Sequence, residues 1–63
     1  MNNTLRQEVR VLKALQNIKY KEIAEKIGIS QDSIYNWLRG SYDFGEARLQ
    51  LLSVVLKEYK GEK

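Results

Sequence analysis

The sequence predicts an all-α protein, a small bundle of four helices or of five that forms a single domain over residues 1–63. Two observations support this prediction. The chain has 63 residues and no proline, and it is rich in leucine, lysine, glutamate, alanine and glutamine, which favour helices. Its apolar residues recur at helical spacing, and no segment alternates as a surface strand would. Because so short a chain buries only about 60 % of its unfolded surface, stability must come from packing, to which self-association can add.

A first helix is expected over residues 4–16, with an apolar side and a basic side. The apolar side comprises Leu5, Val9, Leu12 and the neighbouring Leu15. The basic side comprises Arg6, Arg10 and Lys13. Such a basic stripe is usually a solvated face, and this is the interpretation we favour. The alternative is that it lies beside nucleic-acid phosphates.

The next two helices are expected close together, over residues 20–27 and about 31–39. Gly28 can adopt the positive φ that ends a helix, and the hydroxyl of Ser30 can cap the start of the following helix. Gly40 is expected to end that helix. Two helices joined by three residues that include glycine are typical of a helix-turn-helix unit.

A fourth helix is expected over about 44–59. Asp43 and Glu46 are spaced as a capping box, so we expect them to satisfy free N–H groups at its start. The helix carries two apolar stripes, which is more apolar surface than one interface needs. One stripe comprises Phe44, Ala47, Leu51 and Val55, and the other comprises Leu49, Leu52 and Leu56. We expect the second stripe to form a homodimer contact, the alternative being that a small domain wraps the whole helix into its core.

The helix over about 31–39 has two chemically different sides when its residues are placed about 100° apart. The apolar side, expected to face the core, comprises Ile34, Trp37 and Leu38. The outward side comprises Gln31, Asp32, Tyr35, Asn36 and Arg39. Amide and guanidinium groups can make paired hydrogen bonds with adenine and guanine in the major groove of DNA, which an α-helix fits. We therefore expect this side to read base edges, the alternative being a helical hairpin with an inactive outer face.

Two residues of this helix have competing interpretations. Asp32 can accept a hydrogen bond from a cytosine amine, or it can simply stabilise the start of its own helix, and the pattern favours neither. Trp37 could be a stacking platform for single-stranded nucleic acid, but its place beside Ile34 and Leu38 favours the core.

The stretch YKEIAEKIGISQDSIYNWL resembles the helix-turn-helix of the lambda-repressor-like, Cro/CI-type family. The matching positions are Ala24, Gly28, Ile34 and Trp37, with Ile23, Ile27 and Ile29 in the accompanying apolar places. The resemblance covers about residues 5–56. It implies a sequence-specific transcriptional regulator, a phage-type repressor that binds double-stranded DNA as a homodimer. The family usually has a fifth helix, where we expect one long fourth helix.

Under this hypothesis a second group of residues contacts the DNA backbone. These residues are Lys19, Tyr20, Lys21, Ser30, Ser41 and Tyr42. Tyr42 is either a plain loop residue or a phosphate contact aided by the backbone N–H groups of Gly40 and Ser41. The segment SIYNWL also resembles homeodomain-like modules of transposases and phage packaging proteins, which is the leading alternative within the DNA-binding class.

Composition argues against several other classes of function. The chain has no cysteine and no histidine, which removes disulfides, most zinc sites and most nucleophile–base pairs. We therefore expect no metal, no cofactor, no small-molecule ligand and no enzymatic activity. The net charge of +3 is compatible with a polyanionic partner without demanding one. The rival from another class is a helical protein-interaction module, of anti-repressor type, that uses the apolar fourth helix.

The chain shows no targeting or membrane segment by sequence. Its N-terminus lacks the apolar centre of a signal peptide, and its longest apolar run is too short to span a bilayer. We expect a cytoplasmic, nucleoid-associated protein of a bacterial or phage-infected cell.

Overall fold

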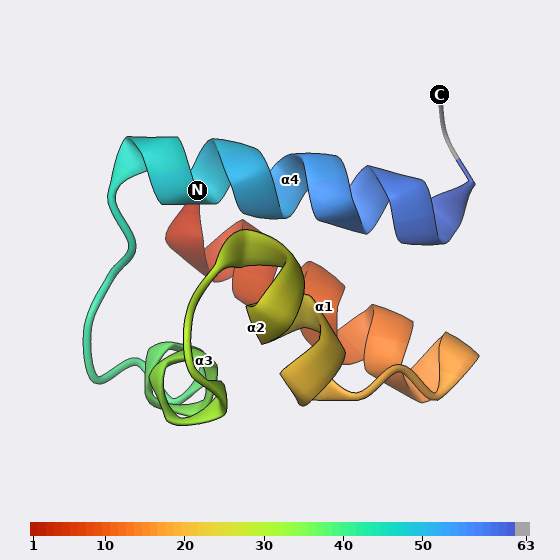
Figure 1. The fold of residues 1–63 in the computed structure, drawn as a ribbon, viewed down its shortest axis with the longest axis horizontal. Coiled ribbons are helices and arrows are strands. Elements are labelled where there is room, and N and C mark those ends of the chain that lie inside the picture. Colours follow the sequence, from red (N-terminus) through yellow and green to blue (C-terminus); the bar gives the residue numbers. More distant parts are fainter. Residues whose placement is uncertain (62–63) are drawn as a thin grey trace.

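The computed structural model describes residues 1–61 and contains four α-helices in that part of the chain. They are α1 (Asn2–Gln16), α2 (Tyr20–Ile27), α3 (Gln31–Leu38) and α4 (Glu46–Lys60), shown in Figure 1. The predicted all-α class is confirmed. The first helix begins two residues earlier than predicted and the fourth two residues later, whereas α2 has the predicted bounds. Over the described residues no helix has the length and apolar character needed to cross a membrane.

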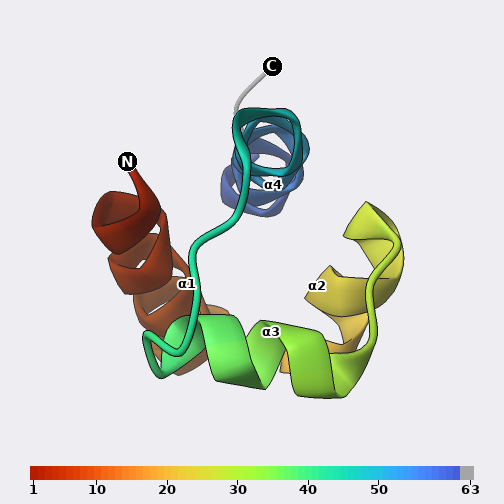
Figure 2. The same cartoon turned by 90° about the vertical axis from the view of Figure 1, so that its left-hand side faces the viewer.

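The helices α3 and α4 lie on opposite sides of the protein. α4 packs against α1 and α2, and α2 packs against α3. Figure 2 shows α3 crossing at the bottom between α1 and α2, with α4 seen nearly end-on above them. One side of α3 therefore faces the core, and the opposite side faces away from the other three helices.

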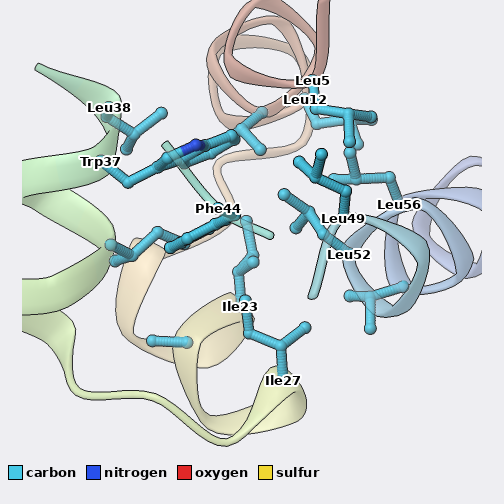
Figure 3. Packing of buried hydrophobic residues seen from close by; sticks show 14 of the residues in the cluster. Leu5, Leu12, Ile23, Ile27, Trp37, Leu38, Phe44, Leu49, Leu52 and Leu56 are labelled. Atoms are coloured by element: carbon cyan, nitrogen blue, oxygen red, sulfur yellow. The ribbon is translucent and has the colours of Figure 1, made fainter. Parts of the chain in front are cut away.

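Trp37 and Phe44 join α3 to the rest of the core. Trp37 is fully buried, and its indole stacks on the Phe44 ring with centroids 4.5 Å apart and an interplanar angle of 8°. In Figure 3 the two aromatic side chains lie among core side chains of the other helices, including Ile23 and Leu49. The core interpretation of Trp37 is confirmed, and its ring faces are not available to stack on a nucleobase.

The turn between α2 and α3 depends on one glycine and one serine. Gly28 has a φ of 78°, and the N–H groups of Gly28 and Ile29 donate to carbonyls of the last turn of α2 at 3.2 and 3.0 Å. This is a Schellman motif, which glycine accommodates because it has no Cβ. The Ser30 hydroxyl accepts a hydrogen bond from the Ser33 N–H at 3.1 Å, which confirms the predicted N-cap of α3.

The start of α4 differs from the prediction. Gly45 is the N-cap of this helix, and no side chain caps it. Asp43 lies two residues before that N-cap, and its carboxylate binds the Arg6 guanidinium at 2.8 Å. The predicted capping box of Asp43 and Glu46 is therefore wrong, because the carboxylate is used by α1 instead.

α4 buries a wide face because it packs against both α1 and α2. Leu49, Leu52 and Leu56 are 5 %, 0 % and 1 % exposed and belong to the core. The predicted homodimer contact through these three leucines is therefore wrong, and the wrapped-helix alternative describes them correctly. The apolar side chains that α4 leaves exposed are Ala47, Leu51 and Val54.

Candidate nucleic-acid interface

The structure places four of the five predicted base-reading residues on the outward side of α3, which ends at Leu38, and the fifth, Arg39, beside them as the C-cap residue. Ile34, Trp37 and Leu38 fix the opposite side to the core and are at most 6 % exposed. Gln31, Asp32, Tyr35 and Arg39 are exposed, and Asn36 is half-buried. The predicted division of the helix into an apolar and a polar side is confirmed. The role of the polar side stays a prediction.

Two hydrogen bonds hold these outward side chains in pairs. The Gln31 amide donates to the Tyr35 hydroxyl at 3.0 Å, and the Arg39 guanidinium donates to the side-chain oxygen of Asn36 at 2.5 Å. Tyr35 keeps its hydroxyl proton, Asn36 keeps its amide N–H groups, and Arg39 keeps its other donors for an outside acceptor. Side chains held in place in this way lose less conformational entropy when they bind a partner.

Asp32 is exposed in the first turn of α3. The Ser30 hydroxyl already caps this helix, so the carboxylate is not needed as a cap. Its charge still suits the positive end of the helix dipole. No hydrogen bond or ion pair joins the Asp32 carboxylate to another described residue, so both of its oxygens can accept from an outside donor.

The start of α2 lies beside the outward side of α3. The ring of Tyr20 meets the ring of Tyr35 edge-on, with centroids 5.4 Å apart, and the Lys13 ammonium lies 5.1 Å from the Tyr20 centroid. Lys19 is the N-cap residue of α2, with no side-chain capping bond. Because Lys19 and Lys21 are both exposed, this segment adds two ammonium groups near the edge of the α3 face.

Ser41 and Tyr42 follow α3 and are bound to it. The N–H groups of Gly40 and Ser41 donate to carbonyls of the last turn of α3, both at 3.0 Å, and Gly40 has a φ of 84°. These N–H groups bind carbonyls within the chain, so they are not free to aid a phosphate contact by Tyr42. The contact of Tyr42 itself with DNA stays a prediction. The Tyr42 hydroxyl donates to the Ser33 carbonyl at 2.7 Å, so Tyr42 braces the loop against α3.

Two arginines of α1 bind the end of α3, which neither interpretation of the basic stripe anticipated. Arg6 is buried, and its Nε donates to the Trp37 carbonyl at 2.6 Å. The Nη2 of Arg10 donates to the Leu38 carbonyl at 2.5 Å. The acceptors are backbone carbonyls 31 and 28 residues away along the chain. No local sequence signal identifies such partners.

Many of these polar and charged side chains line one open groove beside α3. It is lined by Arg10, Tyr20, Asp32, Tyr35, Asn36, Leu38 and Arg39. Two guanidinium groups, an amide, two phenols and one carboxylate therefore share one surface. Guanidinium and amide groups can bind phosphates and base edges, and a carboxylate can accept from a base amine.

The chain matches the model of one protein family. That family is described as helix-turn-helix, and the match covers residues 9–62, which is most of the chain. The protein belongs to this helix-turn-helix family, of the lambda-repressor/Cro type, and is a DNA-binding helix-turn-helix regulator. The resemblance predicted from the sequence is confirmed. Searches of curated proteins and of solved structures gave no significant match.

Proposed function

We propose that this regulator is a sequence-specific repressor of the phage type that inserts α3 into the major groove of double-stranded DNA and binds as a homodimer. The observation that supports it best is the division of α3 into a buried apolar side and an outward side that carries amides, a phenol and a guanidinium. The protein acts in the cytoplasm by occupying its DNA site, with no cofactor and no catalytic step.

The shape of α3 and the burial of Trp37 favour double-stranded over single-stranded DNA. An α-helix with its side chains is about 10–12 Å across, which matches the width of the major groove, so α3 with its 8 residues can lie in it. Single strands are usually held by aromatic rings on which bases stack. Trp37 is fully buried and cannot act in this way.

We assign base contacts from the chemistry of the outward side chains. Arg39 can pair with guanine, and the Gln31 amide can pair with adenine. Asn36 supports Arg39 through its side-chain oxygen and can donate through its amide. Asp32 is repelled by phosphates, so it belongs near a base edge, where a cytosine amine is its natural donor.

The experiment that tests this function is selection from a random double-stranded DNA library. We expect an enriched motif that contains guanine and adenine contacts and has two-fold symmetry. Binding to the motif should fall steeply with salt, because phosphate contacts release counterions. The absence of both an enriched motif and salt-dependent binding would support the protein-interaction module instead. The exposed Leu51 and Val54 are the feature that such a module would use.

Loss of a lysine near the start of α2 should weaken binding to every DNA sequence. Lys19→Ala or Lys21→Ala removes one phosphate contact, so we expect the slope of log affinity against log salt to fall by about one for each variant. Titrations of the selected motif and of random duplex over a salt series measure this slope. Lys57→Ala is the matched control, because Lys57 is exposed on α4, on the opposite side of the protein from α3. Equal slopes for all of these variants would argue against the assignment.

The homodimer contact, if it uses α4, must involve the side chains that the core leaves exposed. Ala47, Leu51 and Val54 recur at spacings of four and three on one face of α4 and line a shallow surface together with Gln50. Helix-turn-helix proteins read two half-sites through two-fold symmetry. A single module of this size buries little DNA surface, which makes the second copy important for affinity.

A charge in this exposed patch should prevent the second copy from binding. Leu51 is 54 % exposed, and Leu51→Lys should lower affinity for a two-half-site DNA by about tenfold or more while leaving half-site binding unchanged. Gel-shift stoichiometry and light scattering measure the two effects. Leu15→Lys is the matched control, because Leu15 is 76 % exposed on α1. A wild-type protein that binds a full site strictly as a monomer would remove this proposal.

A further inference from the structure

The N-terminal half of α1 holds the end of α3 and the following loop through one buried guanidinium. The Nε of Arg6 donates to the Trp37 carbonyl at 2.6 Å, and its Nη2 donates to the Tyr42 carbonyl at 2.8 Å. The same Nη2 donates to the Asp43 carboxylate at 2.8 Å, and Nη1 donates to the side-chain oxygen of Asn3 at 2.8 Å. The guanidinium also lies 5.2 Å from the Trp37 ring centroid. One side chain therefore ties three segments together.

Asn2 extends this arrangement to the core aromatic pair. Its side-chain oxygen accepts from the Trp37 indole N–H at 2.8 Å and from the Phe44 backbone N–H at 2.9 Å. We call Asn2, Asn3 and Arg6 the α1 clamp. All three precede residues 9–62, to which the family model matches. The α1 clamp therefore lies outside the part of the chain that the family match covers.

Hydrogen bonds of Arg6 and Tyr42 link the end of α3, the following loop and α1 to one another. Arg6 joins the carbonyls of Trp37 and Tyr42, and the Tyr42 hydroxyl returns to the Ser33 carbonyl at 2.7 Å. Ser33 and Trp37 are one helical turn apart. Arg39 follows Trp37 by two residues, so a shift of this end would move its guanidinium relative to the DNA.

The chemistry of the α1 clamp requires arginine. Three nitrogens of a planar group donate in different directions to four oxygens, and a lysine ammonium cannot reproduce that geometry. A buried charge costs free energy unless it is paired and hydrogen-bonded, and the side chain of the paired Asp43 is 70 % exposed. Apolar residues of similar volume often replace such a group without loss of stability. Because such a group adds little net stability, we interpret the hydrogen bonds of Arg6 as fixing the position of the end of α3 relative to α1.

We propose that Arg6 is a positioning residue for DNA recognition, which holds the end of α3 so that Arg39 meets its base pair in the correct orientation. This inference rests on the proposed function, because it requires α3 to read a DNA site. Arg6 does not itself touch DNA, since its side chain is 8 % exposed and four of its five N–H donors bind oxygens within the chain. It acts through the backbone that leads to Arg39.

The test compares Arg6→Lys with the matched control Arg48→Lys. Like Arg6, Arg48 lies over a core aromatic ring, in its case that of Phe44 with the centroid 5.4 Å away, but it belongs to α4 and is exposed. Wild-type protein first selects its site, and Arg39→Ala and Gln31→Ala then show which base pair each residue reads. Each clamp variant is measured on the site, on copies altered at either base pair and on random duplex. All measurements use a temperature at which circular dichroism shows folded protein.

Arg6→Lys should lower affinity for the selected site by about tenfold and remove discrimination at the base pair of Arg39. Discrimination at the base pair of Gln31 should stay, and affinity for random duplex should change by less than about twofold. In a protein that already carries Arg39→Ala, adding Arg6→Lys should not lower affinity for the selected site any further. Arg48→Lys should keep wild-type values throughout. If Arg6→Lys does not fold, Asp43→Ala, which removes the exposed partner, should give a weaker loss of the same pattern.

Equal losses on all DNA, or unchanged discrimination at the base pair of Arg39, would show that the clamp serves stability alone and would overturn the inference. Additive effects of Arg6→Lys and Arg39→Ala would overturn it as well. A wild-type protein that selects no site would remove the proposed function, and with it this inference. That outcome is distinguishable because it is seen before any variant is compared.

Discussion

Trp37→Ala should unfold the protein at room temperature. The indole is fully buried, stacks on Phe44 and donates a hydrogen bond to Asn2. Removal of so large a buried side chain costs about 3–5 kcal/mol. A core of this size rarely supplies more than about 3–5 kcal/mol of net stability, so the loss is comparable to the entire free energy of unfolding. Far-UV circular dichroism during heating measures the change.

Tyr35→Ala is the matched control for this loss, because it removes an aromatic ring from the exposed side of the same helix. Tyr35 is 41 % exposed, contacts Tyr20 in a T-shaped arrangement and accepts one exposed hydrogen bond from Gln31, so we expect a loss of about 1 kcal/mol or less. A Trp37→Ala protein that melts within a few degrees of wild type would contradict the central place of this residue in the core.

Arg39→Ala should have the largest single effect on recognition of the selected DNA site. A bidentate pair between arginine and guanine contributes about 1–3 kcal/mol of discrimination, which is roughly 5- to 150-fold in affinity. Binding to random duplex should weaken only by the loss of one charge. Competition titrations give the ratio of affinities for the selected site and for random duplex. An equal loss of affinity for both DNAs would show that Arg39 contacts the DNA backbone instead of a base.

The pairing of the outward side chains makes a further prediction about how their effects combine. Arg39 is hydrogen-bonded to Asn36, whereas Gln31 is bonded to Tyr35 one turn further toward the start of the helix. Arg39→Ala and Asn36→Ala should therefore be non-additive, and Arg39→Ala and Gln31→Ala should add. A double-mutant cycle on the selected site measures both. Additivity of the first pair would show that the bond has no part in recognition.

The helix-turn-helix unit could be predicted because its signals are local. Gly28 adopts the positive φ that only glycine accepts easily, and the Ser30 hydroxyl bonds an N–H three residues on. Trp37 and its apolar neighbours follow the 3.6-residue period, so the buried side of α3 was correctly predicted. Each of these features depends on residues within one or two turns of one another.

The faces of α4 could not be predicted in the same way. A helix with two apolar stripes can bury either or both, and the choice depends on how many helices lie against it. Because α1 and α2 both pack on α4, Leu49, Leu52 and Leu56 are buried, and Leu51 and Val54 are left outside. The N-cap of α4 was mispredicted for a related reason, since Arg6 takes the carboxylate of Asp43.

Periodicity along the chain was enough to place four helices and the polar side of α3, and the signals of Gly28 and Ser30 were enough to place the turn of the helix-turn-helix. Only the folded arrangement decided what Arg6 and Arg10 do. Their spacing on α1 is that of an ordinary solvated stripe, yet both donate to carbonyls at the end of α3. Every residue offers the same backbone carbonyl, so no pattern of side chains marks which carbonyls an arginine will reach. That choice exists only once α1 and the end of α3 have been brought together by the packing of the core.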